Sequence, residues 1–290
     1  MSPLYTVFRA STVDLDFLEW YFQSSHWHRY MKLNGDSGAR ADRIAIKDST
    51  FFDMPIKTPV NIKEQVLIGE TLEKFNQYVT LHQRKLEHLN LKKKALLQKL
   101  FPKNGERYPE LRFPGFTDAW EQRKVNDIFK ITRGQVLATL LTTPKKTSQN
   151  IYPVYSSQTK NNGLMGYYSE YLFENAITWT TDGANAGTVN FRPGRFYSTN
   201  VNGVLINENG YACYAVSEII NKVAYKYVSK VGNPKLMNNV MSEINIMITP
   251  DIDELEQISK LIEAYNQYIT LHQQEPFLCG NSVNGGVELC

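Results

Sequence analysis

The sequence lacks the features that mark secreted or membrane-spanning proteins. Only three cysteines occur in 290 residues, none of them in a CxxC motif, which argues for a reducing compartment and against a disulfide framework. No run of 18 apolar residues is present, so we expect no transmembrane helix. The first ten residues do not combine a charged segment with an apolar one, so we expect no signal peptide. The cytoplasm is the expected location.

Motifs for phosphate, cofactor and metal binding are missing as well. There is no GxxxxGK[ST] loop, no GxGxxG after a strand and no Asn-Pro-Pro-aromatic methyltransferase motif. The stretch 181–187, TDGANAG, contains glycines but reads as a tight turn in a β-rich region. His26 and His28 would need distant ligands to hold a metal. We therefore expect no cofactor, no metal and no catalytic site, which disfavours a stand-alone nuclease or methyltransferase.

A long amphipathic helix is predicted from Glu64 to Phe101. Its apolar residues recur at alternating intervals of four and three, the a/d spacing of a coiled coil, and this spacing requires a partner helix. Near its end, the stretch from Arg84 to Lys103 contains seven basic residues and a single acid. This composition fits either a solvated helix face or a surface that binds phosphates. The seam positions are Ile68, Leu72, Phe75, Val79, His82, Leu86, Leu89, Lys93, Leu96 and Leu100.

The first half of this helix occurs a second time. Residues 254–273 align with residues 64–83 without a gap, and ten of the twenty positions are identical, where ordinary composition gives about one or two. This internal repeat supplies the partner helix. We expect the matched histidines at 82 and 272 to pack or hydrogen-bond rather than bind metal. The second seam consists of Ile258, Ile262, Tyr265, Ile269 and His272.

The rest of the chain predicts an α+β fold. Residues 152–250 consist of short apolar runs split by Gly, Asn and Ser turns, typical of a β-rich domain, with a helix at 213–230. Residues 1–63 offer only a strand at 5–9, a helix at 14–23 and a strand near 52–57, too little for an independent core. Between the two parts, Trp120 with its neighbouring aromatics is interpreted as a hydrophobic plug rather than a recognition surface.

Several segments together resemble the specificity (S) subunit of type I restriction-modification systems. They are GDSGARADRIAIKDSTFFDMPI, the repeated helix ending in LHQ, RFPGFTDAWEQRKV, YPVYSSQTKNNGLMGYY and TDGANAGTVNFRPGRFYSTNV. The resemblance covers about residues 1–274. It implies two target-recognition domains that each read half of a split double-stranded DNA site, held apart by an antiparallel coiled coil. It also implies that the coil docks modification (methyltransferase) subunits, that restriction subunits join the complex, and that the S subunit carries no catalysis.

The resemblance sets the expected organisation. Residues 1–63 would be the C-terminal part of a first recognition domain, 64–103 the first coil helix, 104–250 the second recognition domain, 251–275 the second coil helix and 276–290 an irregular tail. Relative to this family, we expect the chain to start inside the first recognition domain, and Pro276 is expected to end the second helix early. Leu86, Leu89, Leu96 and Leu100 would then lack a partner and favour self-association or a second half-subunit. The alternative function is a truncated or silent fragment that docks subunits without reading DNA.

Recognition of DNA requires amides and guanidinium groups for base edges, and cations and hydroxyls for phosphates. The loops of residues 104–250 supply such groups, although each one alone would pass as an ordinary turn residue. As a set they are the predicted DNA contacts: Ser157, Gln158, Thr159, Lys160, Asn161, Asn185, Arg192, Arg195, Asn200, Lys230, Lys235 and Asn238, with Arg40 and Arg43 in the first part.

Overall fold

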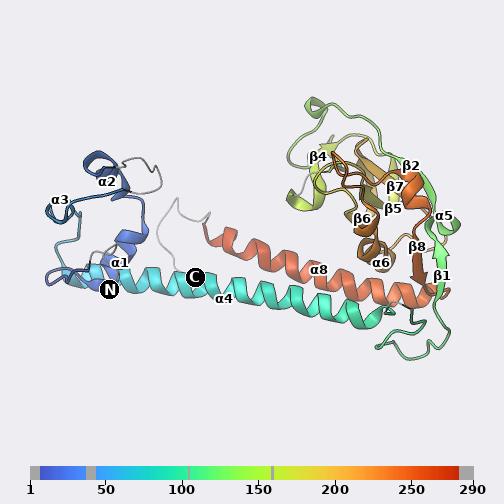
Figure 1. Ribbon diagram of the computed structural model, residues 1–290, viewed down its shortest axis with the longest axis horizontal. Coiled ribbons are helices and arrows are strands. Elements are labelled where there is room, and N and C mark those ends of the chain that lie inside the picture. Colours follow the sequence, from blue (N-terminus) through green and yellow to red (C-terminus); the bar gives the residue numbers. More distant parts are fainter. Residues whose placement is uncertain (1–6, 37–43, 104, 158–159, 281–290) are drawn as a thin grey trace. The chain divides into compact units, whose positions relative to one another are not determined.

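The computed structural model describes residues 7–36, 44–103, 105–157 and 160–280. The chain forms two compact units, residues 1–86 and 87–290, and the boundary between them falls inside the long helix α4 (Ile62–Leu100). Figure 1 shows the elements of each unit. Among the described residues, no helix is both long and apolar enough to cross a membrane.

The first unit consists of three short helices and the start of α4. They are α1 (Leu15–Gln23), α2 (His28–Asn34) and α3 (Asp48–Phe52). Asp14 caps α1 by accepting a hydrogen bond from the backbone N–H of Phe17 at 2.9 Å. A cluster of aromatic rings replaces a sheet as the small core of this unit, with centroid distances of 5.6 to 6.1 Å. Its members are Phe8, Phe22, Trp27, Phe51 and Phe52.

Helix α1 docks on the first turns of α4. The side chain of Gln65, only 3% exposed, accepts a hydrogen bond from the N–H of Asp14 and donates one to the carbonyl of Pro59. One turn later, a Cβ atom on Gly69 would lie 3.0 Å from both the Asp16 Cβ and the Phe17 nitrogen. The single glycine of α4 therefore allows the start of α1 to approach closely.

Two expectations for this unit are corrected. The strand predicted near 52–57 is wrong, because residues 48–52 form α3 and the chain continues without a paired strand to residue 59. Phe52, at the start of the predicted strand, instead joins the aromatic cluster together with Phe51. The strand predicted at 5–9 lies partly outside the described residues, and residues 7–9 have no regular structure. The helix predicted at 14–23 is confirmed as α1.

The second unit is built on a curved six-stranded sheet with the order β2-β7-β5-β6-β3-β4. Its pairs are antiparallel except β3 with β6, which is parallel. A separate antiparallel pair joins β1 to β8. The strands are β1 (Glu121–Lys124), β2 (Lys130–Arg133), β3 (Tyr152–Tyr155), β4 (Leu164–Tyr168), β5 (Phe173–Thr180), β6 (Val189–Ser198), β7 (Asn202–Ile206) and β8 (Asn245–Ile248).

Helices cover one face of this sheet and complete the unit. Helix α6 (Tyr214–Ala224) packs on β6 and on the long helix α8 (Ile252–Gly280). The predicted helix at 213–230 is thus shorter than expected and ends in a 3₁₀ turn, η3 (Tyr225–Tyr227). The short elements are α5 (Val125–Ile128), α7 (Asn238–Ser242) and the 3₁₀ turns η1 (Thr139–Leu141) and η2 (Lys160–Gly163).

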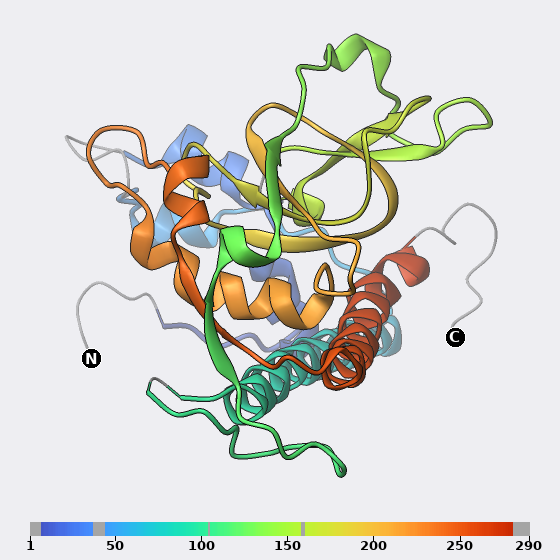
Figure 2. The same cartoon turned by 90° about the vertical axis from the view of Figure 1, so that its right-hand side faces the viewer.

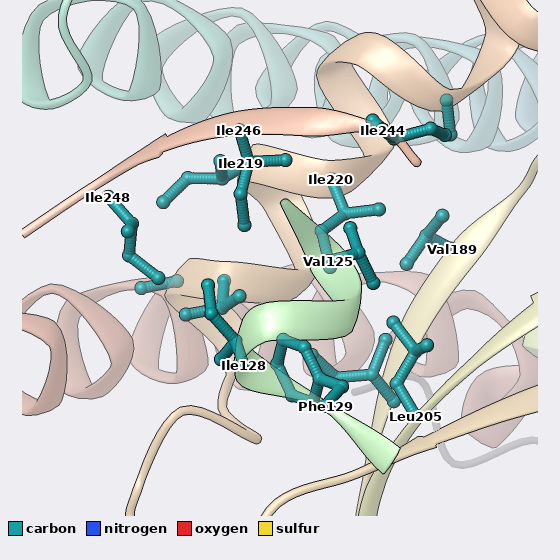
Figure 3. Packing of buried hydrophobic residues seen from close by; sticks show 14 of the residues in the cluster. Val125, Ile128, Phe129, Val189, Leu205, Ile219, Ile220, Ile244, Ile246 and Ile248 are labelled. Atoms are coloured by element: carbon teal, nitrogen blue, oxygen red, sulfur yellow. The ribbon is translucent and has the colours of Figure 1, made fainter. Parts of the chain in front are cut away.

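The larger of two apolar clusters holds the sheet, α6 and α8 together, and the smaller one consists of Ala176, Phe196 and Val204. Figure 3 shows how residues from β6, β7 and β8 converge with α5 and α6 in this core, including Val125, Ile220 and Leu205, which are all fully buried. A Cβ on Gly203 would lie 2.1 Å from the Trp179 ring, so only glycine fits where the indole packs on β7. Trp120 is fully buried beside Phe101, with ring centroids 6.1 Å apart, which confirms the hydrophobic plug.

The end of α4 belongs to the same core, which corrects the expectation that its far half lacks a partner. Leu100 is 4% exposed and lies in one buried cluster with Ile258 and Ile262, while Leu96 packs against that cluster. Further back, the Lys93 ammonium donates to Asn266 at 2.9 Å and to Glu218 at 2.8 Å. Later residues of α8 thus meet earlier residues of α4, so the two helices run in opposite directions here.

The start of α8 is fixed by a buried ion pair. The Arg112 guanidinium donates two hydrogen bonds, at 2.7 and 2.8 Å, to the carboxylate of Glu254, whose side chain is 1% exposed. The bond to Glu254 raises the pKa of Arg112. At the other end, α8 continues to Gly280, so the expectation that Pro276 stops it is wrong. A proline removes its own N–H bond and bends a helix but need not end it.

Candidate nucleic-acid interface

Arg133, at the end of β2, ties together several loops at one end of the sheet. Its Nε donates to the carbonyl oxygen of Asn200 at 2.8 Å, and its Nη2 lies 3.6 Å from Oδ2 of Asp182. The other carboxylate oxygen of Asp182 lies 3.8 Å from the Lys235 ammonium. One carboxylate therefore holds two half-exposed cations side by side, which leaves a net positive charge at this end of the sheet.

Backbone bonds lock the loop that follows β5 to the loop before α7. Gly183 donates to the carbonyl of Pro234 at 3.0 Å, and Leu236 donates to the carbonyl of Thr181 at 2.9 Å. Thr181 is fully buried, and its hydroxyl lies 2.8 Å from Oδ2 of Asp182. The tight turn expected at 181–187 is present, with positive φ angles at Gly183 and at the last glycine of the stretch.

The loop after β3 joins the loops that Arg133 and Asp182 hold together, and we call this set of loops the loop assembly. The Asn185 amide donates to the carbonyl of Ser157 at 3.0 Å. The loop is closed by a backbone bond from Ser156 to Gly163 at 2.8 Å. Asn161 and Asn162 have φ angles of 51° and 52°, a left-handed conformation that costs energy outside glycine and recurs at functional sites. Gln158 and Thr159 lie outside the described residues, and nothing is described of the Lys160 side chain.

The two predicted arginines of β6 do not lie in this assembly. Arg192 is 6% exposed; its Nε donates to the Thr178 hydroxyl at 3.1 Å, and its guanidinium lies 3.8 Å from the centre of the Tyr155 ring. Burial lowers the pKa of Arg192 to about 10. Arg195 pairs with Glu174 at 3.1 Å. The Arg192 guanidinium is thus largely covered by Tyr155, and a DNA contact by Arg192 stays a prediction.

The remaining predicted contacts are distributed around the assembly. Lys230 is exposed in the loop that contains Lys235. The Asn238 amide donates to the carbonyl of Thr132 at 3.4 Å, next to Arg133. Arg40 and Arg43 lie outside the described residues. Ser157, Asn161, Asn185, Asn200, Lys235 and Asn238 are therefore the predicted residues that the structure brings together.

Arg133 is a member of this assembly that was not among the predicted contacts, although the sequence contains a signal for it. Between Asp127 and Glu170, 42 consecutive residues carry five basic side chains and no acid, and Arg133 is one of the five. A second acid-free stretch, 219–242, carries four lysines. Acid-free basic segments that fold onto one domain are an electrostatic feature of nucleic-acid binding.

The basic end of α4 behaves differently from these loops. Lys93 is held by Glu218, and the ammonium groups of Lys99 and Lys103 lie 3.0 and 3.3 Å from the Glu110 carboxylate. These partners lower the pKa of Glu110. The cationic run predicted on α4 is therefore partly neutralised within the chain, which favours the loops over α4 as the surface that meets phosphates.

The matched histidines pack in the same way in both helix copies. His82 lies 4.2 Å from Tyr78 between ring centroids, and His272 lies 4.5 Å from Tyr268, each at an interplanar angle of 48°. His272 Nδ1 is 2.9 Å from the Tyr268 carbonyl oxygen. Both histidines are thus packed on a tyrosine one turn earlier, and a hydrogen bond is added at His272. Among the residues that the structure describes, no three His, Cys, Asp or Glu side chains gather in a group suited to a metal ion.

Residues 117–277 match the family described as the type I restriction modification DNA specificity domain. The matched stretch is more than half of the 290 residues, and the chain belongs to this family. The family comprises the non-catalytic, DNA-recognising components of type I restriction-modification systems. The resemblance noted in the sequence is thereby confirmed.

Relatives from Mycoplasma pneumoniae have the corresponding names. The N-terminus of a putative type I specificity subunit is 35% identical over 145 residues, which are 49% of this chain and 75% of that protein. A second putative type I specificity subunit is 31% identical over 147 residues, 50% of this chain and 39% of the relative. The specificity subunit of the type I restriction enzyme MpnII is 32% identical over 169 residues, 57% of this chain and 47% of that protein. The matched stretches thus span less than half of the last two relatives.

Two solved structures share the fold. The crystal structure of a type I restriction-modification S subunit from M. genitalium has a TM-score of 0.67 at 15% identity and covers 91% of this chain and 69% of that chain. A structure from work on complex assembly and conformational transition of the type I system has a TM-score of 0.54 at 13% identity, covering 91% and 66%. At these identities the likeness concerns the fold, which is α+β as predicted.

Proposed function

We propose that this chain is a specificity subunit that reads DNA sequence with residues 104–250 and positions a methyltransferase on the site. The observation that carries this proposal is the convergence of separate polar loops at one end of the sheet, held by Arg133, Asp182 and Asn185. Amides and cations fixed by internal hydrogen bonds are suited to contact base edges and phosphates with little loss of entropy. The alternative of a docking scaffold that reads no DNA does not explain this arrangement.

We extend the proposal to a bipartite site. Residues 1–63 would be the C-terminal part of a first recognition domain, because α1, α3 and the start of α4 repeat the order of α6, α7 and α8. Helices α3 and α7 both have five residues and lie 190 positions apart, the same offset as the helix repeat. In this proposal, Arg40 and Arg43 occupy the loop that corresponds to the one carrying Lys230 and Lys235.

We assign the docking of modification subunits to the coil helices, with restriction subunits joining through the complex in the cytoplasm. The support is an apolar seam that stays exposed in the first unit: Leu72, Phe75 and Val79 are 37%, 50% and 42% exposed. Three apolar side chains at heptad spacing on one helix favour binding of another helix. A second copy of this chain or a second half-subunit would also satisfy this surface.

Co-purification with the modification subunits of the same host, followed by sequencing of methylated sites, tests the function. A defined motif in the methylated sites is the expected result. A stable complex that leaves DNA unmodified would instead support the docking scaffold. Strand cleavage or methyl transfer by the purified chain alone would contradict the non-catalytic role.

The loop assembly is tested by a matched pair of variants on β2. R133A removes the side chain that holds Asn200 and Asp182, and we expect about tenfold weaker binding of the methylated motif. K130A removes the same charge from the other end of the strand and should change affinity less than about twofold. If both variants lose affinity equally, net charge rather than the loop assembly carries binding.

A further inference from the structure

The turn that follows β2 is both apolar and exposed. Such exposure is unusual for an apolar turn on a protein surface that binds no partner. In residues 135–141, QVLATLL, the side chains of Val136, Leu140 and Leu141 are 77%, 96% and 51% exposed. Single exposed leucines are common on protein surfaces, but three large apolar side chains in six residues are not. The apolar composition of this exposed turn therefore requires a physical explanation.

Backbone hydrogen bonds anchor this turn at both ends. At its start, Gly134 donates to the carbonyl of Asn202 at 3.1 Å and Gln135 donates to that of Ser198 at 3.0 Å. At its end, Thr143 and Tyr167 exchange two backbone hydrogen bonds at 2.9 and 3.0 Å. The η1 helical turn between these anchors presents Leu140 outward, and in Figure 2 it is the green turn at the top of the second unit, beyond the strands. A backbone anchored at both ends loses less conformational entropy on binding than a loose one.

The surroundings of the turn select its partner. It begins directly after Arg133, and Gln135 pairs with Thr199, which precedes Asn200 of the loop assembly. It is followed by Lys145 and Lys146 and by the hydroxyl and amide side chains of 147–150, TSQN. The whole turn lies inside the 42-residue acid-free stretch. An apolar tip flanked by cations and small polar groups matches a DNA groove bordered by phosphates, to which those cations are attracted.

We propose that residues 136–141 form an apolar finger that enters a groove of the duplex, with Leu140 packed against bases and the two lysines on the flanking phosphates. Apolar side chains contact thymine methyl groups in the major groove and wedge between base steps in the minor groove. This inference rests on the proposed DNA-reading function. It adds a non-polar contact to a surface for which the sequence predicted only polar and charged contacts.

Photo-crosslinking in the complex with modification subunits tests the partner directly. Leu140 is replaced by p-benzoylphenylalanine, and the complex is irradiated on a duplex that carries the methylated motif. A DNA adduct is expected at position 140 and none at Leu91, an apolar residue of α4 that is 64% exposed. An adduct with a modification subunit, or no adduct from a complex that binds the duplex, would overturn the proposal.

Binding measurements separate this inference from the function on which it rests. L140A should weaken binding of the motif about tenfold, whereas L140M keeps an apolar tip and should stay within about twofold. Because Leu140 is almost fully exposed, neither change should alter folding. K145A/K146A should reduce the slope of log affinity against log salt by about two. Wild-type complex that cannot tell the motif from scrambled DNA refutes the function; wild-type selectivity with an unaffected L140A refutes only the finger.

Discussion

The two copies of the repeated helix carry the same seam in different surroundings. In α8, Ile262 and Ile269 are 2% and 9% exposed, and Ile262 belongs to the core of the second unit. The matched residues of α4, Leu72 and Val79, are 37% and 42% exposed. Ten identities in twenty positions therefore do not give two equal environments. A heptad pattern identifies the face that needs a partner, but the rest of the fold decides whether the same chain supplies one.

The segments that lead into the two helices differ for a related reason. Both copies contain a five-residue helix that ends in a residue with αR geometry, Asp53 after α3 and Glu243 after α7. After α7 the chain forms β8, because β1 is available to pair with it. The described residues after α3 have no such partner strand and stay irregular. Whether a segment forms a strand thus depends on a partner strand, even where two segments correspond in sequence.

The largest effect should come from truncating the buried seam. I262A removes most of a side chain that is 2% exposed and leaves a cavity, so we expect a loss of about 3 to 4 kcal/mol in the free energy of unfolding of the second unit. L72A at the matched, half-exposed position should cost less than about 1 kcal/mol. Urea unfolding at a concentration where the chain is monomeric, with hydrogen exchange to separate the units, measures both. Equal losses would mean that the two seams are equally buried in solution.

A somewhat smaller effect is expected at the ion pair that begins the second copy. R112A leaves the Glu254 carboxylate buried without its partner and should destabilise the second unit by about 3 kcal/mol. R112K keeps the charge but loses the bidentate hydrogen bonding, so its stability should lie between those of the wild type and R112A. The matched residue of the first copy, Glu64, is exposed, so E64A should change stability by only a few tenths of a kcal/mol. Thermal unfolding of the three variants compares them, and a negligible effect of R112A would show that water compensates Glu254.

The sequence predicted the architecture well and the site less completely, for physical reasons that particular residues make clear. Seam periodicity predicted that Leu89, Lys93, Leu96 and Leu100 share one face, and all four are at least partly buried. Local patterns do not report long-range contacts, so the sequence did not predict that Tyr155 covers Arg192. Arg133 was missed because its role depends on Asn200 and Asp182, which come from other strands and loops.

The smallest effect should appear where a preceding helix docks on each copy. Gly69 corresponds to Ser259, whose hydroxyl oxygen accepts a hydrogen bond from the backbone N–H of Ala215 at the start of α6, at 3.0 Å. S259A leaves that buried N–H without its acceptor and should cost about 1 to 2 kcal/mol.

In G69A, two effects oppose each other. Alanine favours the helix by up to about 1 kcal/mol, but its Cβ would press on Asp16 and on the backbone of Phe17 at 3.0 Å. We expect a net change below about 1 kcal/mol, with faster amide exchange confined to α1. Hydrogen exchange resolved by peptide measures this. Slower exchange in α1 of G69A would show that α1 does not rest on Gly69, and that the docking of a helix at this position is specific to the second copy.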